Sequence, residues 1–366
     1  MTYLFIRSFY FYAVPINMSM KILLSPFHGN GLDLRNHMVM SPMTRSRAEG
    51  YLPNALMAEY YAQRATAGLI ITEGTAPAAE GLGYFKTPGI FNQEQVEGWK
   101  LVTAAVHEKG GKIFVQLMHT GRINNIRNLP KEAKRIHVTA VHQEGLEPVP
   151  LNAAGVRQLQ HEFAEAAKNA IAAGFDGIEL HGAHGYLLEQ FLNPHFNTRS
   201  DEYGGNYVNR SRFIIETAAA CIAAIGKERT GIRISPFAKT NEMPPYDAKE
   251  THDTYVHLAK ALNELGLVYL HISLNPQIPK ETLAAIRESF TGTLILANGQ
   301  TAASAEALLQ SKAADLVAFG KLFLANPDLV ERFRTDAALN APNAGKMYGG
   351  GAEGYTDYPT LGEQSK

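Results

Sequence analysis

The chain has 366 residues, a formal net charge of −1 and 45% hydrophobic residues, a composition typical of a folded globular protein. It contains no block of basic or acidic residues, which argues against nucleic acid as a partner. The only cysteine, Cys221, excludes an intrachain disulfide and fits a cytoplasmic protein. Cys221 falls in an expected helix, where a small buried residue is a better interpretation than a nucleophile.

The first twenty residues are rich in aromatic and aliphatic side chains, and Arg7 is their only charge. They lack the basic start and the cleavage site of a signal peptide. Pro15 and Asn17 interrupt the stretch before it reaches the roughly 20 apolar residues that a membrane span needs. We expect residues 1–19 to be an extension outside the fold without stable membrane association; a weak membrane anchor is the alternative. Residues 20–366 then form a single domain.

From residue 21 onward, the chain alternates between short apolar runs and longer helical ones. Glycine, proline and asparagine within residues 24–36 predict a hairpin. Strands are expected at residues 37–40, 69–72, 112–117, 177–181, 232–234, 268–273, 293–297 and 316–319. Helices are expected at residues 54–67, 93–109, 154–173, 208–225, 251–265, 279–289, 302–310 and 326–334.

The fold follows from this alternation. Eight apolar strands separated by helices, without period-two alternation, indicate a parallel sheet that is covered on both faces. We therefore predict an α/β protein, a (β/α)8 TIM barrel with an N-terminal hairpin across its bottom. Residues 119–150 form a long insert after strand three, which we expect to cap the barrel mouth. An open, doubly wound sheet is the alternative, disfavoured because no Gly-x-Gly-x-x-Gly motif follows the first strand.

The end of the fourth strand carries an unusual group of side chains. His181 and His184 are three residues apart and project to one side of a helical turn, and Tyr186 can reach the same pocket. Imidazole N–H groups can hold a polarised oxygen, and a phenol can supply a proton. A zinc site that also uses Glu179 is the alternative. Hydrolytic zinc motifs instead place two histidines four residues apart with a glutamate between them, so we expect no metal.

The other strand ends add groups suited to a phosphorylated cofactor. The ends of strands seven and eight are where such barrels bind phosphate, and Arg233 would place a fixed charge inside the mouth. An internal salt bridge is the alternative role for Arg233. A flavin mononucleotide (FMN), with a ring edge that suits a cation and with a phosphate tail, fits this set of groups: Thr44, Gln116, Arg233, Asn298, Gly299, Gly320 and Lys321.

Several long motifs recur in one order. They are Ser-Pro-Met-Thr-Arg at 41–45, Gln-Leu-Met-His-Thr-Gly-Arg at 116–122, His-Gly-Ala-His-Gly-Tyr-Leu-Leu at 181–188 and the runs 197–205, 209–213, 232–236, 319–321, 325–329 and 348–359. With these motifs the chain, from about residue 20 to 361, resembles the old yellow enzymes. These are FMN-dependent ene-reductases, and the resemblance is to the bacterial branch with N-ethylmaleimide reductase and pentaerythritol tetranitrate reductase.

The resemblance implies an NAD(P)H-dependent flavin oxidoreductase that reduces activated C=C bonds in unsaturated carbonyls, nitroalkenes or maleimides, with quinones and nitrate esters as further substrates. His181 and His184 would bind the oxygen of the substrate's activating group, and Tyr186 would protonate the α-carbon. The substrate pocket would be lined by Tyr84, Met118 and Tyr348. Non-covalent FMN would be bound by Pro42, Met43, Thr44, Gly74, Gln116, Arg233, Asn298, Gly299, Gly320 and Lys321. Relatives are often monomers, so a monomer is expected.

Four positions depart from the family pattern. Met118 stands where close bacterial relatives usually carry Trp, and Lys321 replaces an Arg, which keeps the charge but loses the bidentate fork. Asn298 stands where a small residue is common, and Val208 replaces an acidic residue. Two other classes of function stay open: a flavin-binding or sensing protein without turnover, and a metal-dependent barrel hydrolase. The physiological substrate and the preference for NADPH or NADH are not encoded in any motif.

Overall fold

A computed structural model describes residues 21–131, 133–134, 136–139 and 149–364. The predicted extension at residues 1–19 lies outside these described residues. Within them, no helix combines the length and the apolar character needed to cross a membrane.

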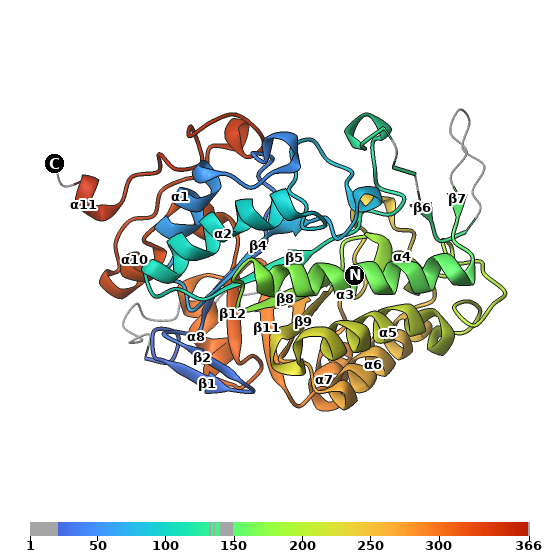
Figure 1. Cartoon of the computed structure of the whole chain (residues 1–366). Coiled ribbons are helices and arrows are strands. Elements are labelled where there is room, and N and C mark those ends of the chain that lie inside the picture. Colours follow the sequence, from blue (N-terminus) through green and yellow to red (C-terminus); the bar gives the residue numbers. More distant parts are fainter. Residues whose placement is uncertain (1–20, 132, 135, 140–148, 365–366) are drawn as a thin grey trace, which may run out of the picture.

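The centre of the molecule is a closed barrel of eight parallel strands (Figure 1), which confirms the predicted fold class. Every strand is buried along its whole length, as expected for strands covered on both faces. Around the barrel, the eight strands pair in the order in which they occur in the chain, with the separate β6–β7 pair inserted between β5 and β8, and β12 closes the ring on β3. The strands are β3 (Met38–Met40), β4 (Leu69–Thr75), β5 (Ile113–Leu117), β8 (Gly177–Gly182), β9 (Thr230–Ile234), β10 (Tyr269–Ser273), β11 (Thr293–Ala297) and β12 (Leu316–Phe319).

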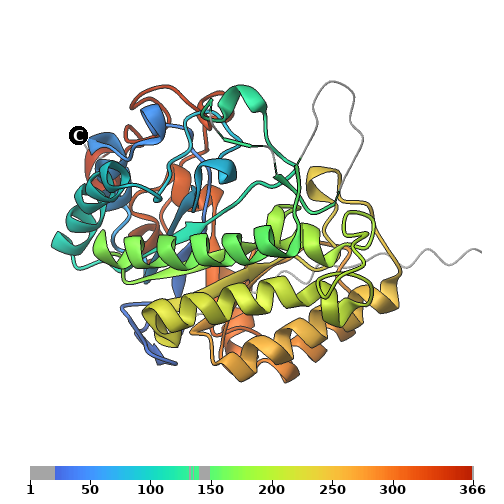
Figure 2. The ribbon, with the colours of Figure 1, turned by 45° about the vertical axis from the view of Figure 1, so that its right-hand side comes forward.

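Helices cover the outside of the barrel, and α3, α5 and α6 lie side by side along it (Figures 1 and 2). Several begin at an asparagine whose side chain accepts a hydrogen bond from a backbone N–H in the first turn, as Asn54 does from Met57. The covering helices are α1 (Ala55–Gln63), α2 (Gln93–Glu108), α3 (Ala153–Ala172), α5 (Tyr207–Ile225), α6 (Ala248–Leu265), α7 (Lys280–Ser289), α8 (Ala302–Gln310) and α10 (Leu329–Thr335).

The predicted hairpin is present as the antiparallel strands β1 (Phe27–Gly29) and β2 (Leu32–Leu34). Leu32 and Leu34 join a hydrophobic cluster with residues that begin barrel strands, such as Leu69 and Leu316. The hairpin therefore closes the barrel at the amino ends of its strands. The carboxyl ends are left open for a site.

Short elements and boundaries differ from the sequence-based prediction. The structure adds α4 (Leu187–Leu192), α9 (Lys321–Ala325) and α11 (Leu361–Gln364), which are too short for a periodic signal. The helix predicted at 326–334 begins only at Leu329. Strand β4 runs on to Thr75 because a register shift between Ile71 and Gly74 lets it continue pairing with β5. Within the insert after β5, the structure describes a small pair, β6 (Ile136–His137) and β7 (Val149–Pro150).

Candidate active site

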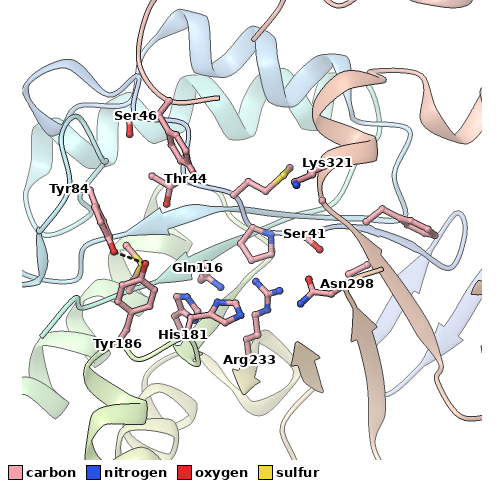
Figure 3. Close-up of a pocket in the computed structure, with 18 of the residues that line it drawn as sticks. Ser41, Thr44, Ser46, Tyr84, Gln116, His181, Tyr186, Arg233, Asn298 and Lys321 are labelled. Carbon is pink, nitrogen blue, oxygen red and sulfur yellow. Dashed lines mark hydrogen bonds between the residues drawn. The ribbon is translucent and has the colours of Figure 1, made fainter. Parts of the chain in front are cut away.

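A pocket of about 1440 Å³ opens at the carboxyl ends of the barrel strands (Figure 3). It gathers every site residue predicted from the sequence except Gly74. The predicted residues in its lining are Pro42, Met43, Thr44, Tyr84, Gln116, Met118, His181, His184, Tyr186, Arg233, Asn298, Gly299, Gly320, Lys321 and Tyr348. Pockets for one drug-sized ligand are commonly about 300–1,000 Å³, so this one has room for a cofactor and a second molecule together.

The two histidines lie edge to face, with ring centroids 5.3 Å apart. Burial lowers the pKa of His184 to about 3 and that of His181 well below its usual value; Arg233 lowers both further. Both imidazoles are therefore neutral at physiological pH. His181 Nδ1 is buried without a hydrogen-bond partner among the described residues, so it is available to a ligand.

A strained turn presents His184. Its φ of 58° lies in the left-handed region, which a non-glycine residue adopts at a cost in energy. Three contacts hold the turn: the His184 backbone N–H donates to Ser235 Oγ at 2.8 Å, Asn241 Nδ2 donates to the His184 carbonyl at 2.8 Å, and the ring Nε2 lies 2.8 Å from Ser273 Oγ. Behind the turn, the buried carboxylate of Glu189 accepts from Ser235 Oγ and the Gly185 N–H. The position of the ring is thus set by several elements at once.

Tyr186 and Tyr84 meet at one end of the pocket (Figure 3), where their hydroxyl oxygens are 3.0 Å apart. The Tyr186 ring centroid is 4.9 Å from that of His181. Burial, with Tyr84 adding to it, raises the pKa of Tyr186 above its ordinary value. The phenol therefore keeps its proton and can act as a donor.

The centre of the pocket holds an unsatisfied cation. Arg233 is 4% exposed, and its Nε has no hydrogen-bond partner among the described residues. Burial lowers its pKa, which the Glu179 carboxylate and Tyr269 oppose. A buried guanidinium with an unpaired donor is costly unless a ligand supplies the acceptor.

At the other end of the pocket, the ends of β11 and β12 bring Asn298, Gly299, Gly320 and Lys321 together. Asn298 and Gly299 both have positive φ, 78° and 70°. Asn298 Nδ2 donates to Ser273 Oγ at 2.7 Å and to the Leu274 carbonyl at 3.0 Å. The Asn298 side chain therefore positions the loop and also reaches, through Ser273, the ring of His184.

The loop of residues 347–351 borders the pocket and is held by hydrogen bonds from the segment that follows β3. Arg45 Nε donates to the Met347 carbonyl at 2.9 Å, and Arg47 Nε donates to the Gly351 carbonyl at 3.0 Å. Tyr348 sits between these anchors and is 70% exposed. The motif that carries Thr44 thus also fixes the loop that carries Tyr348.

Gly74 is not among the lining residues; it lies against Met118, which is one of them. A Cβ atom at Gly74 would come within 2.6 Å of the Met118 Sδ and Cε atoms, so glycine makes room for the thioether. Sequence reasoning missed several lining residues because none of them carries a charged or titratable side chain, although Phe85 and Gly349 adjoin predicted residues. These are Ser41, Ser46, Phe85, Asn128, Asn241, Gln300, Ala318, Phe319, Leu322, Gly349 and Gly350.

The alternative zinc site considered from the sequence would require Glu179 to lie beside His181 and His184. Glu179 instead accepts a hydrogen bond from Gln116 Nε2 at 2.8 Å, and its other oxygen lies 2.8 Å from His271 Nδ1. Across the part of the chain that the structure describes, no three His, Cys, Asp or Glu side chains group as metal ligands.

Comparisons with known proteins identify the class to which this barrel and its site belong, the flavin-dependent oxidoreductases. A sequence profile described as the NADH:flavin oxidoreductase / NADH oxidase family matches residues 23–340. The chain belongs to this family, the old yellow enzymes.

The chain aligns with individual relatives over nearly its whole length. The chain is 40% identical to a putative 12-oxophytodienoate reductase 11 of Oryza sativa subsp. japonica, covering 93% of this chain and 97% of that protein. It is 37% identical to 12-oxophytodienoate reductase 2 of Arabidopsis thaliana, covering 93% and 96%. Among solved structures, morphinone reductase in complex with tetrahydroNAD matches with a TM-score of 0.88 and 39% identity over 93% and 97%. The old yellow enzyme homologue from Zymomonas mobilis matches with a TM-score of 0.87 and 36% identity over 93% and 99%.

Proposed function

We propose that this protein is an FMN-dependent oxidoreductase that uses NADPH or NADH to reduce activated C=C bonds in small electrophilic alkenes. The observation that carries the proposal is the meeting of three groups in one pocket: the unpartnered Arg233, the neutral histidine pair and the protonated Tyr186. Membership of the family and the reductase names of the relatives support the same reaction.

The described residues fit FMN. Arg233 has a free Nε donor for the carbonyl-rich edge of the flavin ring, and its charge stabilises the reduced, anionic ring. Thr44 and Gln116 would add neutral hydrogen bonds, while Pro42 and Met43 would lie along the ring. The backbone N–H groups at Asn298, Gly299 and Gly320, with the Lys321 ammonium, would hold the phosphate.

When bound, FMN supplies the hydride that reaches the β-carbon of the substrate. His181 and His184 donate N–H groups to the substrate's carbonyl or nitro oxygen, on which negative charge develops. Because both rings are neutral, they stabilise this charge by hydrogen bonding without giving up a proton at the wrong atom. Tyr186 then donates its phenolic proton to the α-carbon, so that one hydride and one proton complete the C–H bonds of the product.

The substrate end of the pocket is aromatic and adaptable. Tyr84 and Tyr348 would border the alkene, and Met118 supplies a flexible, polarisable wall. This environment suits unsaturated carbonyl compounds, nitroalkenes and maleimides, with quinones and nitrate esters as further acceptors. The single cysteine, Cys221, cannot form an intrachain disulfide, which supports our proposal of a cytoplasmic protein. We also propose that the protein is a monomer.

An isotope experiment on the full-length protein tests the proposal. Purified protein should be yellow, should release FMN on denaturation, and should be bleached by NADPH without oxygen. Reoxidation with 2-cyclohexenone in D₂O should place solvent deuterium on the α-carbon, and deuterated NADPH should label the β-carbon. The absence of bound FMN under flavin-replete expression would refute the proposal. A bleached protein that enones never reoxidise would identify the flavin-binding alternative instead.

A further inference from the structure

A buried carboxylate beneath the pocket is not used by the proposed mechanism. Glu179 on β8 and His271 on β10 both have side chains that are 0% exposed, with Glu179 Oε2 and His271 Nδ1 2.8 Å apart. The other oxygen, Oε1, accepts from Gln116 Nε2 at 2.8 Å. Glu179 is paired with Gln116 between β5 and β8, and it precedes His181 by two residues on the same face of β8.

The chemistry of a carboxylate determines how its neighbours are turned. A carboxylate oxygen only accepts, so Gln116 and His271, which lie within hydrogen-bonding distance of the Glu179 oxygens, must present N–H. The Tyr269 hydroxyl also interacts with Glu179. Gln116 therefore turns its amide nitrogen toward Glu179, which leaves the amide oxygen for the pocket that Gln116 lines. His271 carries its proton on Nδ1, and burial lowers the pKa of His271 so that the ring stays neutral. His271 thus supplies a hydrogen bond without cancelling the charge of Glu179.

Arg233 lies in the neighbouring strand, in register with both His181 and His271. Burial lowers the pKa of Arg233, whereas the negative charge of Glu179 raises it. These strands thus bring together three polar groups. Glu179 only accepts hydrogen bonds, Gln116 has an amide whose orientation Glu179 sets, and Arg233 has an unpartnered Nε donor among the described residues.

We propose that Glu179 is a positioning residue that sets the hydrogen-bonding pattern shown to the cofactor: an acceptor oxygen from Gln116 beside a donor cation from Arg233. This pattern complements a ring edge at which N–H adjoins a carbonyl oxygen, the imide edge of a flavin. The inference rests on the proposed FMN site. Glu179 also opposes the charge of Arg233, so it holds the flavin reduction potential below the value that Arg233 alone would give.

The Glu179→Gln variant tests both effects because it keeps the shape and removes the charge. The new amide can donate as well as accept, so Gln116 loses its single orientation. With FMN labelled at its imide nitrogen with ¹⁵N, we expect the imide proton to exchange with water about tenfold faster than in wild type, as for a weakened hydrogen bond. The preference for reduced over oxidised FMN should rise by at least about tenfold, which is the effect of removing one negative charge about 12 Å away at an effective dielectric of about 20; a closer charge has a larger effect.

The matched control is Glu306→Gln. Glu306 is also a buried carboxylate, but it accepts from the backbone N–H groups of Ile22 and Leu23 and does not line the pocket. The control should change neither the exchange rate nor the potential, although it can lower the melting temperature. A purely structural role for Glu179 predicts the same result in both variants.

Two results would overturn the inference. One is a Glu179→Gln protein that binds FMN with unchanged imide exchange and an unchanged or lower potential. The other needs no variant: wild-type protein labelled with ¹³C should show a through-hydrogen-bond coupling between the Gln116 side-chain carbonyl and the imide nitrogen, and its absence contradicts the assigned orientation. Failure of wild type to bind FMN would instead refute the proposed function, so the two failures are distinguishable.

Discussion

The change Tyr186→Phe removes one hydroxyl and leaves the ring that packs 4.9 Å from His181. A positioned general acid contributes about 10²–10⁴ in rate. Because the Tyr84 hydroxyl lies only 3.0 Å from the one removed, it remains as a second donor near the α-carbon. We therefore expect a loss near the lower limit, about 10² or about 2.7 kcal/mol, for the single variant with an enone. The double variant Tyr84→Phe/Tyr186→Phe should lose about 10⁴.

Stopped-flow measurements of the two half-reactions are the assay. Flavin reduction by NADPH should stay near normal in Tyr186→Phe, because no proton is transferred to a carbon in that step. Reoxidation by 2-cyclohexenone should be slowed more than reoxidation by a nitrostyrene. The enolate from an enone is high in energy and needs the acid in place, whereas a nitronate can leave and be protonated by water.

The control is His181→Ala, which removes a donor to the oxygen and should slow reoxidation by both substrates about 10²–10³-fold. It should also weaken the binding of phenols, which mimic the enolate oxygen. Equal slowing of both substrates by Tyr186→Phe, or impaired flavin reduction, would refute the proton-donor role. Tyr186 would then only position the substrate.

Three further predictions concern the cofactor, the substrate wall and pH. Arg233→Ala should weaken FMN binding by about 10–100-fold and lower the flavin reduction potential, because a charged hydrogen bond is lost; an unchanged potential in spectroelectrochemistry would place Arg233 away from the ring. Met118→Trp should narrow the range of bulky cyclic enones and leave flavin reduction alone, because a rigid bicycle replaces a thioether that packs on Gly74; equal responses of small and bulky enones in steady-state assays would contradict this. Burial raises the pKa of Glu189 from its ordinary 4.5 to about 7, so its contribution to stability is complete below about pH 4.5 and is lost as pH rises through 7. In urea unfolding, the stability of wild type relative to Glu189→Gln should therefore fall by about 3 kcal/mol between pH 4.5 and 8, since one pKa unit is about 1.4 kcal/mol; a flat difference would show that Glu189 does not titrate in this range.

The sequence alone determined the barrel, because its strands are local signals. The eight apolar runs alternate with helical stretches, and both ends of every barrel strand lie within three residues of the predicted ends. Motifs at strand ends could also be assigned to the mouth, since parallel strands in a barrel end on one side. Thus His181, Arg233 and Lys321 were predicted as neighbours although more than 130 residues separate the first from the last.

Only the tertiary structure decided which side chains touch. The Tyr84–Tyr186 contact joins residues 102 positions apart, and Glu179 reaches His271 across 92. No local pattern marks such pairs, because their distance depends on barrel closure and on the register between strands. Gly74 illustrates the limit: the strand was predicted to end at residue 72, but β4 continues through Gly74 after a register shift, and Gly74 packs against Met118 outside the pocket lining. Periodicity predicts which segments form strands, whereas packing and register determine which of their side chains share a site.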